Sequence, residues 1–116
     1  MKVFATFSYS LNAGTDIEQG RIVTVDSSGN AVYADATTNP ATSPLGVSLG
    51  KAKSGSKVLV GLVKGVPFSA VASGAISAGG TVYLANDGKV SASGTNAVGV
   101  AVASAANGAY CQVLGY

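Results

Sequence analysis

The sequence contains no histidine and a single cysteine, Cys111. Without histidine, neither a Ser-His nor a Cys-His catalytic pair can form, and histidine-containing metal sites are excluded as well. One cysteine permits no internal disulfide and no multi-cysteine metal cluster. We therefore expect a protein that is not an enzyme and that uses neither a metal nor a cofactor.

Charged residues are also scarce. They make up 10 % of the 116 residues, and the formal net charge is +2, whereas about 25 % of a typical soluble domain is charged. The seven basic side chains are dispersed and there is no tryptophan, which is a poor footprint for nucleic-acid binding. The unbroken apolar runs are about six residues long, and a membrane helix needs about 20. We expect neither nucleic acid nor a membrane as a partner.

The low charge accompanies a positive mean hydropathy of +0.40. Charge alone cannot keep such a chain dispersed in water. The simplest physical resolution is that much of its surface is buried against other protein subunits. The composition therefore predicts self-assembly.

Two stretches partly match a ligand-binding or a catalytic motif but lack features that the motif requires. The segment 50–57 contains Gly-Ser-Lys where a phosphate-binding loop needs Gly-Lys-Ser, and a strand-forming run follows it instead of a helix. Asp16 and Glu18 are paired carboxylates, but a thin-cored chain of this size has little room for the cleft that glycosidic chemistry requires. We interpret both as surface turns. Cys111 has no histidine to activate it and is expected to be a packing residue.

An internal repeat is the most informative feature of the chain. Gly20 opens a strand-forming stretch that ends in a Ser-Ser-Gly turn, and 59 residues later Gly79 opens a similar stretch that ends in Asn-Asp-Gly. Further along, the offset falls to 53, as in the recurrence of Gly46 at Gly99. The first copy thus carries six extra residues, which we place in the proline-containing loop 36–44. The repeat halves span about 17–63 and 76–116.

Each repeat half reads as four short strands with Gly- and Asn-containing turns between them. Strands at this spacing, with no sustained helical period, predict an all-β fold. We expect a single domain over 12–116, a small compact β-barrel or β-tulip-like domain built from the two sequence-similar halves. One short helix is considered at Phe68–Ser73. The expected strands are 21–26, 31–35, 45–51 and 57–64 in the first half, and 80–85, 89–93, 97–103 and 109–115 in the second.

Residues 1–11 are expected to lie outside the repeat. Their apolar side chains alternate with smaller or polar ones, which is the periodicity of a β-strand. Two interpretations remain open. The segment is either an edge strand of the β domain or an extended N-terminal arm that adds to a sheet of a partner.

The order of several small blocks resembles one protein family. These blocks are 13–26 with 44–47, and 76–83 with 87–90 and 97–101. Over roughly 13–115 the chain is similar to the bacteriophage capsid cement, or head decoration, proteins. The resemblance implies a compact β fold, often trimeric, that binds the outer capsid surface of the mature virion and clamps neighbouring capsid subunits. The implied partners are the major capsid protein and the protein itself, as a homotrimer.

In that family the N-terminal segment often reaches onto the capsid. The resemblance therefore makes the first residues candidate capsid contacts, although a sister subunit or the protein's own core is equally open as their binding site. The candidate capsid contacts are Lys2, Val3, Phe4, Ala5, Thr6, Phe7, Ser8 and Tyr9.

Two other functions share the low charge and the β content. One is another phage structural component, namely a head fibre, a tail-tube protein or a head-completion module. The other is a carbohydrate-binding β module, which normally uses exposed tryptophan or tyrosine to stack on sugars, and this chain has no tryptophan.

Overall fold

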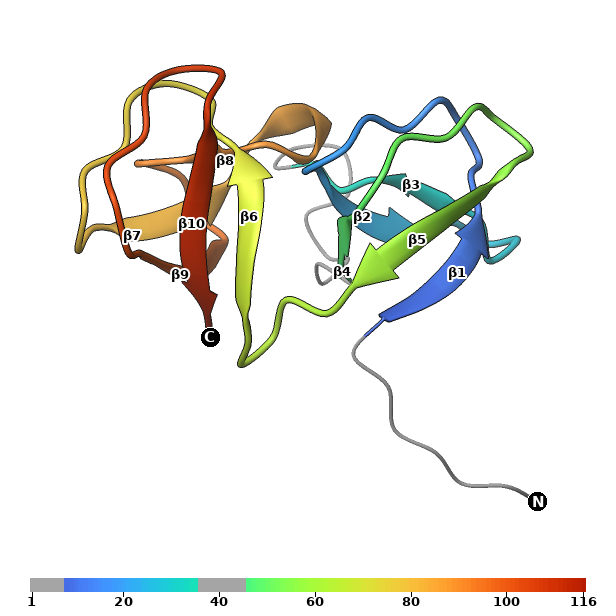
Figure 1. Ribbon diagram of the computed structural model, residues 1–116, viewed down its shortest axis with the longest axis horizontal. Helices are drawn as coiled ribbons and strands as arrows, with labels where there is room; N and C mark the ends of the chain where they lie inside the picture. The colour runs from blue at the N-terminus through green and yellow to red at the C-terminus, as the bar shows by residue number, and fades with distance from the viewer. Residues whose placement is uncertain (1–7, 36–45) are drawn as a thin grey trace.

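The computed structural model describes residues 8–35 and 46–116, which form two antiparallel five-stranded sheets, one after the other along the chain (Figure 1). The strand orders are β1-β5-β4-β2-β3 and β6-β10-β9-β7-β8. The first sheet comprises β1 (Ser8–Asn12), β2 (Ile22–Val25), β3 (Ala31–Tyr33), β4 (Gly46–Ser48) and β5 (Lys57–Gly61). The second comprises β6 (Pro67–Val71), β7 (Thr81–Leu84), β8 (Val90–Ser91), β9 (Ala97–Ala101) and β10 (Tyr110–Gly115), with a 3-10 turn η1 (Asn86–Gly88) before β8. The expected all-β fold is confirmed.

Each sheet curls until its two edges meet. In the first sheet, a parallel bridge joins Ala13, just after β1, to Ala31 at the start of β3. The corresponding bridge in the second sheet joins Ala72 to Val90. Each half is therefore a small, partly closed barrel. We call residues 8–61 the first lobe, residues 62–66 the linker and residues 67–116 the second lobe.

The two lobes repeat the same connections, strand by strand. An isolated bridge between Ile17 and Ala52 in the first lobe recurs between Ile76 and Ala105 in the second. Because the strand orders match, β1 is the equivalent of β6. The structural repeat therefore begins at β1, whereas the sequence analysis placed residues 1–11 outside it.

The short helix considered at Phe68–Ser73 is wrong, because this stretch contains strand β6. Phe68 and Ala70 are buried while Pro67 and Ser69 are exposed. This alternation has the period of two that a strand with one buried face requires. The small residues of the stretch had suggested a helix, and the two-residue alternation decides for the strand.

Two clusters of buried side chains form the core, and one of them crosses from lobe to lobe. The first cluster lies entirely in the first lobe and consists of Ala13, Ile17, Val23, Ala31, Val58 and Val60. The second cluster fills the second lobe, but it also takes in Ile22, Ala34 and Val47 of the first lobe and Val63 of the linker. The lobes are therefore joined by shared apolar burial as well as by the chain.

The linker is held by burial of a side chain and by backbone hydrogen bonds to the C-terminal end of the chain. Val63 is buried in the shared cluster. The Gly65 N–H donates to the Tyr116 carbonyl oxygen at 2.9 Å, and the Gly115 N–H donates to the Val66 carbonyl oxygen at 3.0 Å. The C-terminal end of β10 thus holds the linker in place, and the two lobes have a defined mutual orientation.

Candidate functional site

The N-terminal residues predicted to contact a capsid lie only partly within the described chain. Lys2 to Phe7 are outside the described residues. Ser8 begins β1, where it pairs with Gly61 of β5. Tyr9 follows it and packs half-buried against the first-lobe cluster, and burial raises the pKa of its phenol. Tyr9 thus supports the first-lobe core, and capsid contact by this segment stays a prediction.

A groove of about 670 Å³ separates the two lobes. None of the described residues that line it is charged, and most of this lining is apolar. Its walls come from the first lobe on one side, from β6 and the start of β10 on the other, and from the linker between them. The lining residues are Gln19, Gly20, Val47, Ser48, Leu49, Gly61, Leu62, Val66, Pro67, Phe68, Ser69 and Tyr110.

Two of the groove residues expose large apolar surfaces. Leu49 is 47 % exposed and Tyr110 is 54 % exposed. The Tyr110 ring lies over Gly20, where a side chain would overlap it. A glycine at that position is thus required for the tyrosine to lie across the seam between the lobes.

Further large apolar side chains are exposed outside the groove. Leu59 and Leu114 are exposed on β5 and β10, and Val102 and Tyr116 are exposed in the second lobe. Exposed large apolar side chains together with an apolar groove are the feature of the described residues that best suits binding to another protein. The site that the structure offers is therefore an apolar contact surface.

The seam between the lobes also carries polar contacts. The Val71 N–H donates to the Gly20 carbonyl oxygen at 2.8 Å, and the Gly88 N–H donates to the Ala34 carbonyl oxygen at 2.9 Å. Arg21 crosses the seam and donates from Nη1 to the Asp87 carbonyl oxygen at 3.0 Å. These contacts join the two lobes along the seam.

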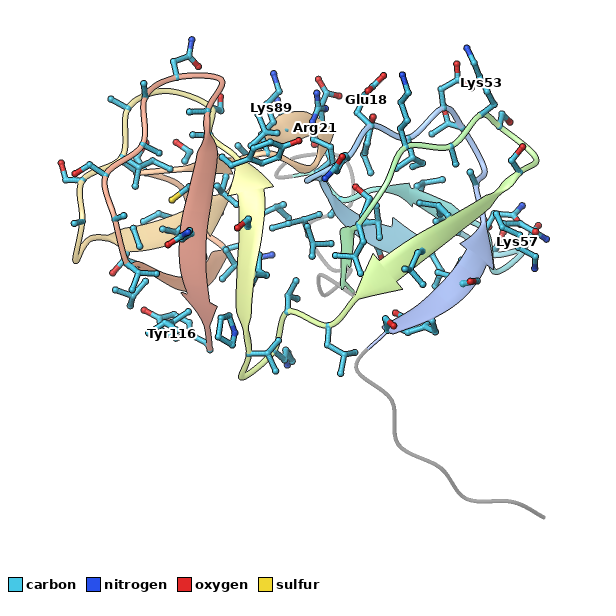
Figure 2. All side chains as sticks on the ribbon, in the orientation of Figure 1. Glu18, Arg21, Lys53, Lys57, Lys89 and Tyr116 are labelled. Carbon is cyan, nitrogen blue, oxygen red and sulfur yellow. The ribbon has the colours of Figure 1, made fainter. Side chains whose placement is uncertain are left out.

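Most of the charged side chains that Figure 2 labels lie along one edge of the molecule, and Lys57 lies apart from them. Figure 2 shows Glu18, Arg21, Lys53 and Lys89 along one edge, while Tyr116 lies at the opposite edge. Arg21 lies over the Tyr33 ring, with its guanidinium carbon 5.3 Å from the ring centroid. Lys53 and Asp16 form an exposed ion pair at 4.0 Å, which contributes little to stability. The exposed Lys64 precedes Gly65, whose N–H donates to the Tyr116 carbonyl oxygen, so the Tyr116 edge carries charge as well.

The described residues offer no obvious reactive group. In residues 8–35 and 46–116, no three His, Cys, Asp or Glu side chains are close enough to hold a metal ion. Cys111 is fully buried, and burial raises the pKa of its thiol. Over the same residues, no helix has the length and hydropathy to cross a membrane.

Sequence reasoning missed the groove and its apolar rim, although one signal was available. In β5 the core positions are Val58 and Val60, so Leu59 between them must face outward. In β10 the buried positions are Cys111 and Val113, so Leu114 is likewise an apolar residue at an outward-facing position. An apolar residue on the outer face of such a strand, where a polar one is usual, indicates a contact surface.

Comparison with solved structures gives a clear match of fold. The N base of the head fibre protein gp8.5 of bacteriophage phi29 superimposes with a TM-score of 0.77 at 17 % sequence identity. The match covers 94 % of this chain and 92 % of that one. At this identity the likeness shows a shared fold. None of the curated protein sequences matches this chain.

The comparison with protein families identifies the family of this chain, which the match of fold alone does not. The model of the phage cement proteins matches residues 4–115, nearly the whole chain. It covers both lobes, the linker between them and the apolar groove. This agrees with the resemblance seen in the order of the small sequence blocks, and the chain belongs to the phage cement protein family.

Proposed function

We propose that this protein decorates the outer surface of a phage capsid as a homotrimer and clamps neighbouring major capsid subunits. The observation that carries the proposal is the apolar contact surface: an uncharged groove together with exposed large side chains such as Leu59, Leu114 and Tyr116. Membership of the phage cement protein family supports a role in the virion. Binding between proteins requires shape and apolar area and no reactive group.

The shared core suits a clamp mechanically. The two lobes are joined by buried side chains and by backbone hydrogen bonds across the seam. A clamp must keep its shape when the subunits that it holds are pushed apart. Three copies around one axis would also present three contact surfaces together, so that weak individual contacts gain avidity.

The test is binding to phage heads that lack the protein, in expanded and unexpanded forms, followed by cosedimentation and particle imaging. We expect saturable binding to expanded heads in a fixed ratio to the major capsid protein. Binding only the expanded shell would stabilise that state, because a ligand shifts an equilibrium by its differential affinity. Absence of binding to either form would reject the proposal.

A head-fibre base is the second candidate, and the fold match to the phi29 head fibre base favours it. A head-fibre base and a decoration protein differ in whether a fibre projects from the bound protein. A fibre base carries a fibre on its outer side, so imaging of intact virions should show a projection from each bound copy. A decoration protein would lie on the capsid surface without a projecting fibre. A carbohydrate-binding module has no specific observation in its favour.

A further inference from the structure

We propose that copies of this chain bind head to tail, with the first lobe of one copy packed on the second lobe of the next in the way that the two lobes already pack within one chain. The partner is a second copy of the protein. This contact specifies the homotrimer of the proposed function and rests on that self-association, but it does not depend on capsid binding.

The contact between the lobes within one chain uses a different face of each lobe. The first lobe contributes the side that carries β2 and β4, which we call the front face of a lobe. The second lobe contributes the side that carries β6, which we call the back face; in the first lobe β1 takes the place of β6. Figure 1 shows β2 and β4 beside β6 at the centre of the molecule. Because the two faces differ, the second lobe keeps its front face unused and the first lobe keeps its back face unused.

The front face of the second lobe is open. The ladders of the two lobes have matching registers, which give an equivalent for each front-face residue of the first lobe. The equivalents of Gly20, Ile22, Ala34, Val47 and Gly61 are Gly79, Thr81, Ser93, Val100 and Leu114. All five residues of the first lobe are buried, and none of the five equivalents is buried. The second lobe thus has the exposure that the first lobe would have without its neighbour.

The back face of the first lobe is open in the same way. The equivalents of Phe68 and Ala70 in β6 are Tyr9 and Leu11 in β1. Phe68 and Ala70 are buried in the cluster that both lobes share, whereas Tyr9 and Leu11 are only half-buried. Figure 1 shows β7 and β9 at one end of the molecule and β1 at the other. The two open faces therefore point in opposite directions, and one copy can follow another.

Apolar side chains are exposed on both open faces. Leu114 is 48 % exposed at the position of the buried Gly61, and Val100, which pairs with Leu114, is half-buried. Tyr9 and Leu11 supply apolar surface on the opposite face. Contact between the two faces would remove this surface from water, which is the main driving force for association of proteins.

One backbone hydrogen bond of the seam can be repeated between copies. Within the chain the Val71 N–H donates to the Gly20 carbonyl oxygen, and the equivalent groups are the Asn12 N–H and the Gly79 carbonyl oxygen. The N–H of the next residue, Ala13, donates to the chain that leads into β5, so the Asn12 N–H faces away from β5. In residues 8–35 and 46–116, neither the Asn12 N–H nor the Gly79 carbonyl takes part in a backbone hydrogen bond outside the ladders.

Two other contacts of the seam have no counterpart between copies. The equivalent of Arg21 is Gly80, which has no side chain to bridge the contact. The equivalent of Gly88 is Gly29, whose N–H donates to Asp26 within its own turn. A single contact between copies is therefore weaker than the seam. Head-to-tail contacts close into a ring when the rotation between copies allows it, and a closed ring holds each copy by two such contacts.

The first experiment measures mass in solution by light scattering. We expect three times the chain mass of 11.3 kDa for the full chain. Leu114→Asp on the open front face should weaken self-association by roughly tenfold or more, because the contact would have to bury a carboxylate. Leu59→Asp is the matched control, because Leu59 is similarly exposed, at 46 %, but lies on neither open face. Circular dichroism checks that each variant is folded.

The second experiment tests the hydrogen bond from the open back face. Asn12→Pro removes the N–H that we assign to Gly79 of the next copy, and proline is tolerated where the N–H of an edge strand faces outward. β1 is such an edge strand. We expect Asn12→Pro to weaken self-association by roughly tenfold. Asn12→Val is the control, because it keeps the N–H and introduces the residue that stands at the equivalent position of β6, and it should associate at least as tightly as wild type.

Mixing the two variants shows whether the contact is head to tail. A Leu114→Asp copy retains its open back face, and an Asn12→Pro copy retains its open front face. We therefore expect the mixture to form heterodimers, with twice the chain mass, at a concentration where each variant alone is monomeric. A contact between two identical faces would not give this result, because each variant would then carry a damaged copy of the shared face.

Three results would overturn the inference. One is a full chain that is monomeric in solution. Another is an oligomer whose mass is unchanged by either Leu114→Asp or Asn12→Pro. The third is a mixture of these two variants that stays monomeric. A protein that forms the oligomer and the heterodimer but binds no heads would refute the proposed function and leave this inference standing.

Discussion

Gly88 provides a sharp test of how the two lobes are joined. It lies in η1, has φ +69°, and is buried at the seam, where its N–H donates to Ala34. A Cβ built on Gly88 would overlap the backbone carbonyl oxygen of Ile22 and would lie 3.1 Å from the Cβ of Arg21. Since the obstacle is backbone, it cannot rotate out of the way. Gly88→Ala must therefore move the lobes apart or distort η1.

The repeat supplies a matched control at Gly29. Gly29 is the first-lobe equivalent of Gly88 and has φ +81°, but nothing lies within 4 Å of a Cβ built there. Gly29→Ala should destabilise the fold only through the left-handed backbone conformation, by about 1–2 kcal/mol. Gly88→Ala includes that effect and adds overpacking of about 1–3 kcal/mol and weakening of one backbone hydrogen bond of about 1 kcal/mol. We expect a total loss of about 3–6 kcal/mol.

Urea unfolding followed by far-ultraviolet circular dichroism measures both variants. Tyrosine fluorescence offers a second probe, because the chain has five tyrosines and no tryptophan. The Gly88→Ala midpoint should fall well below that of Gly29→Ala. If the two variants lose the same free energy of unfolding, the close contact at Gly88 does not join the lobes and the account of the seam is wrong.

Three further predictions concern buried or bridging side chains. Ser48→Ala should lower the free energy of unfolding by about 1–3 kcal/mol, because the buried hydroxyl donates to the Glu18 carbonyl at 2.6 Å and accepts from the Arg21 N–H at 3.0 Å; urea midpoints that match those of wild type would contradict this. Arg21→Lys should lose about 1 kcal/mol, because lysine lacks the planar fork that reaches the Asp87 carbonyl across the seam, and an unchanged melting temperature would argue against the bridge. Burial raises the pKa of the Cys111 thiol. At alkaline pH the folded state therefore retains a proton that the unfolded chain releases. The contribution of this thiol to stability is present below about pH 8 and declines as the pH rises above about 9. The stability difference between wild type and Cys111→Ala should therefore shrink at alkaline pH, and a pH-independent difference would show that the thiol does not titrate on unfolding.

The sequence analysis predicted the strands of the repeat better than it predicted the relation between the halves. Turn residues such as Gly29 and Gly88 are local signals, since only a few residue types adopt their backbone conformation at low cost. The helix considered at Phe68–Ser73 failed because small residues are compatible with either structure, and only the pairing of β6 with β10 decides.

The groove could not be predicted, for a different reason. It depends on how one lobe rests on the other, and that arrangement is set by contacts between residues far apart in the chain. Gly20 and Tyr110 are an example, since nothing local to either residue indicates that they meet. Arg21 and Asp87 are another. What the sequence does contain is an outward-facing apolar residue, Leu59, on a strand whose other face is buried, and this signal indicates a contact surface but not its shape.

The unequal division of the core between the lobes also favours one order of folding during synthesis. The first lobe has a buried cluster made wholly of its own residues, whereas the cluster of the second lobe is completed by Ile22, Ala34 and Val47 from the first. The N-terminal half leaves the ribosome first, and domains generally fold as they emerge. The first lobe can therefore form early and serve as a template on which the second condenses, and half-made chains expose the template surface until synthesis is complete.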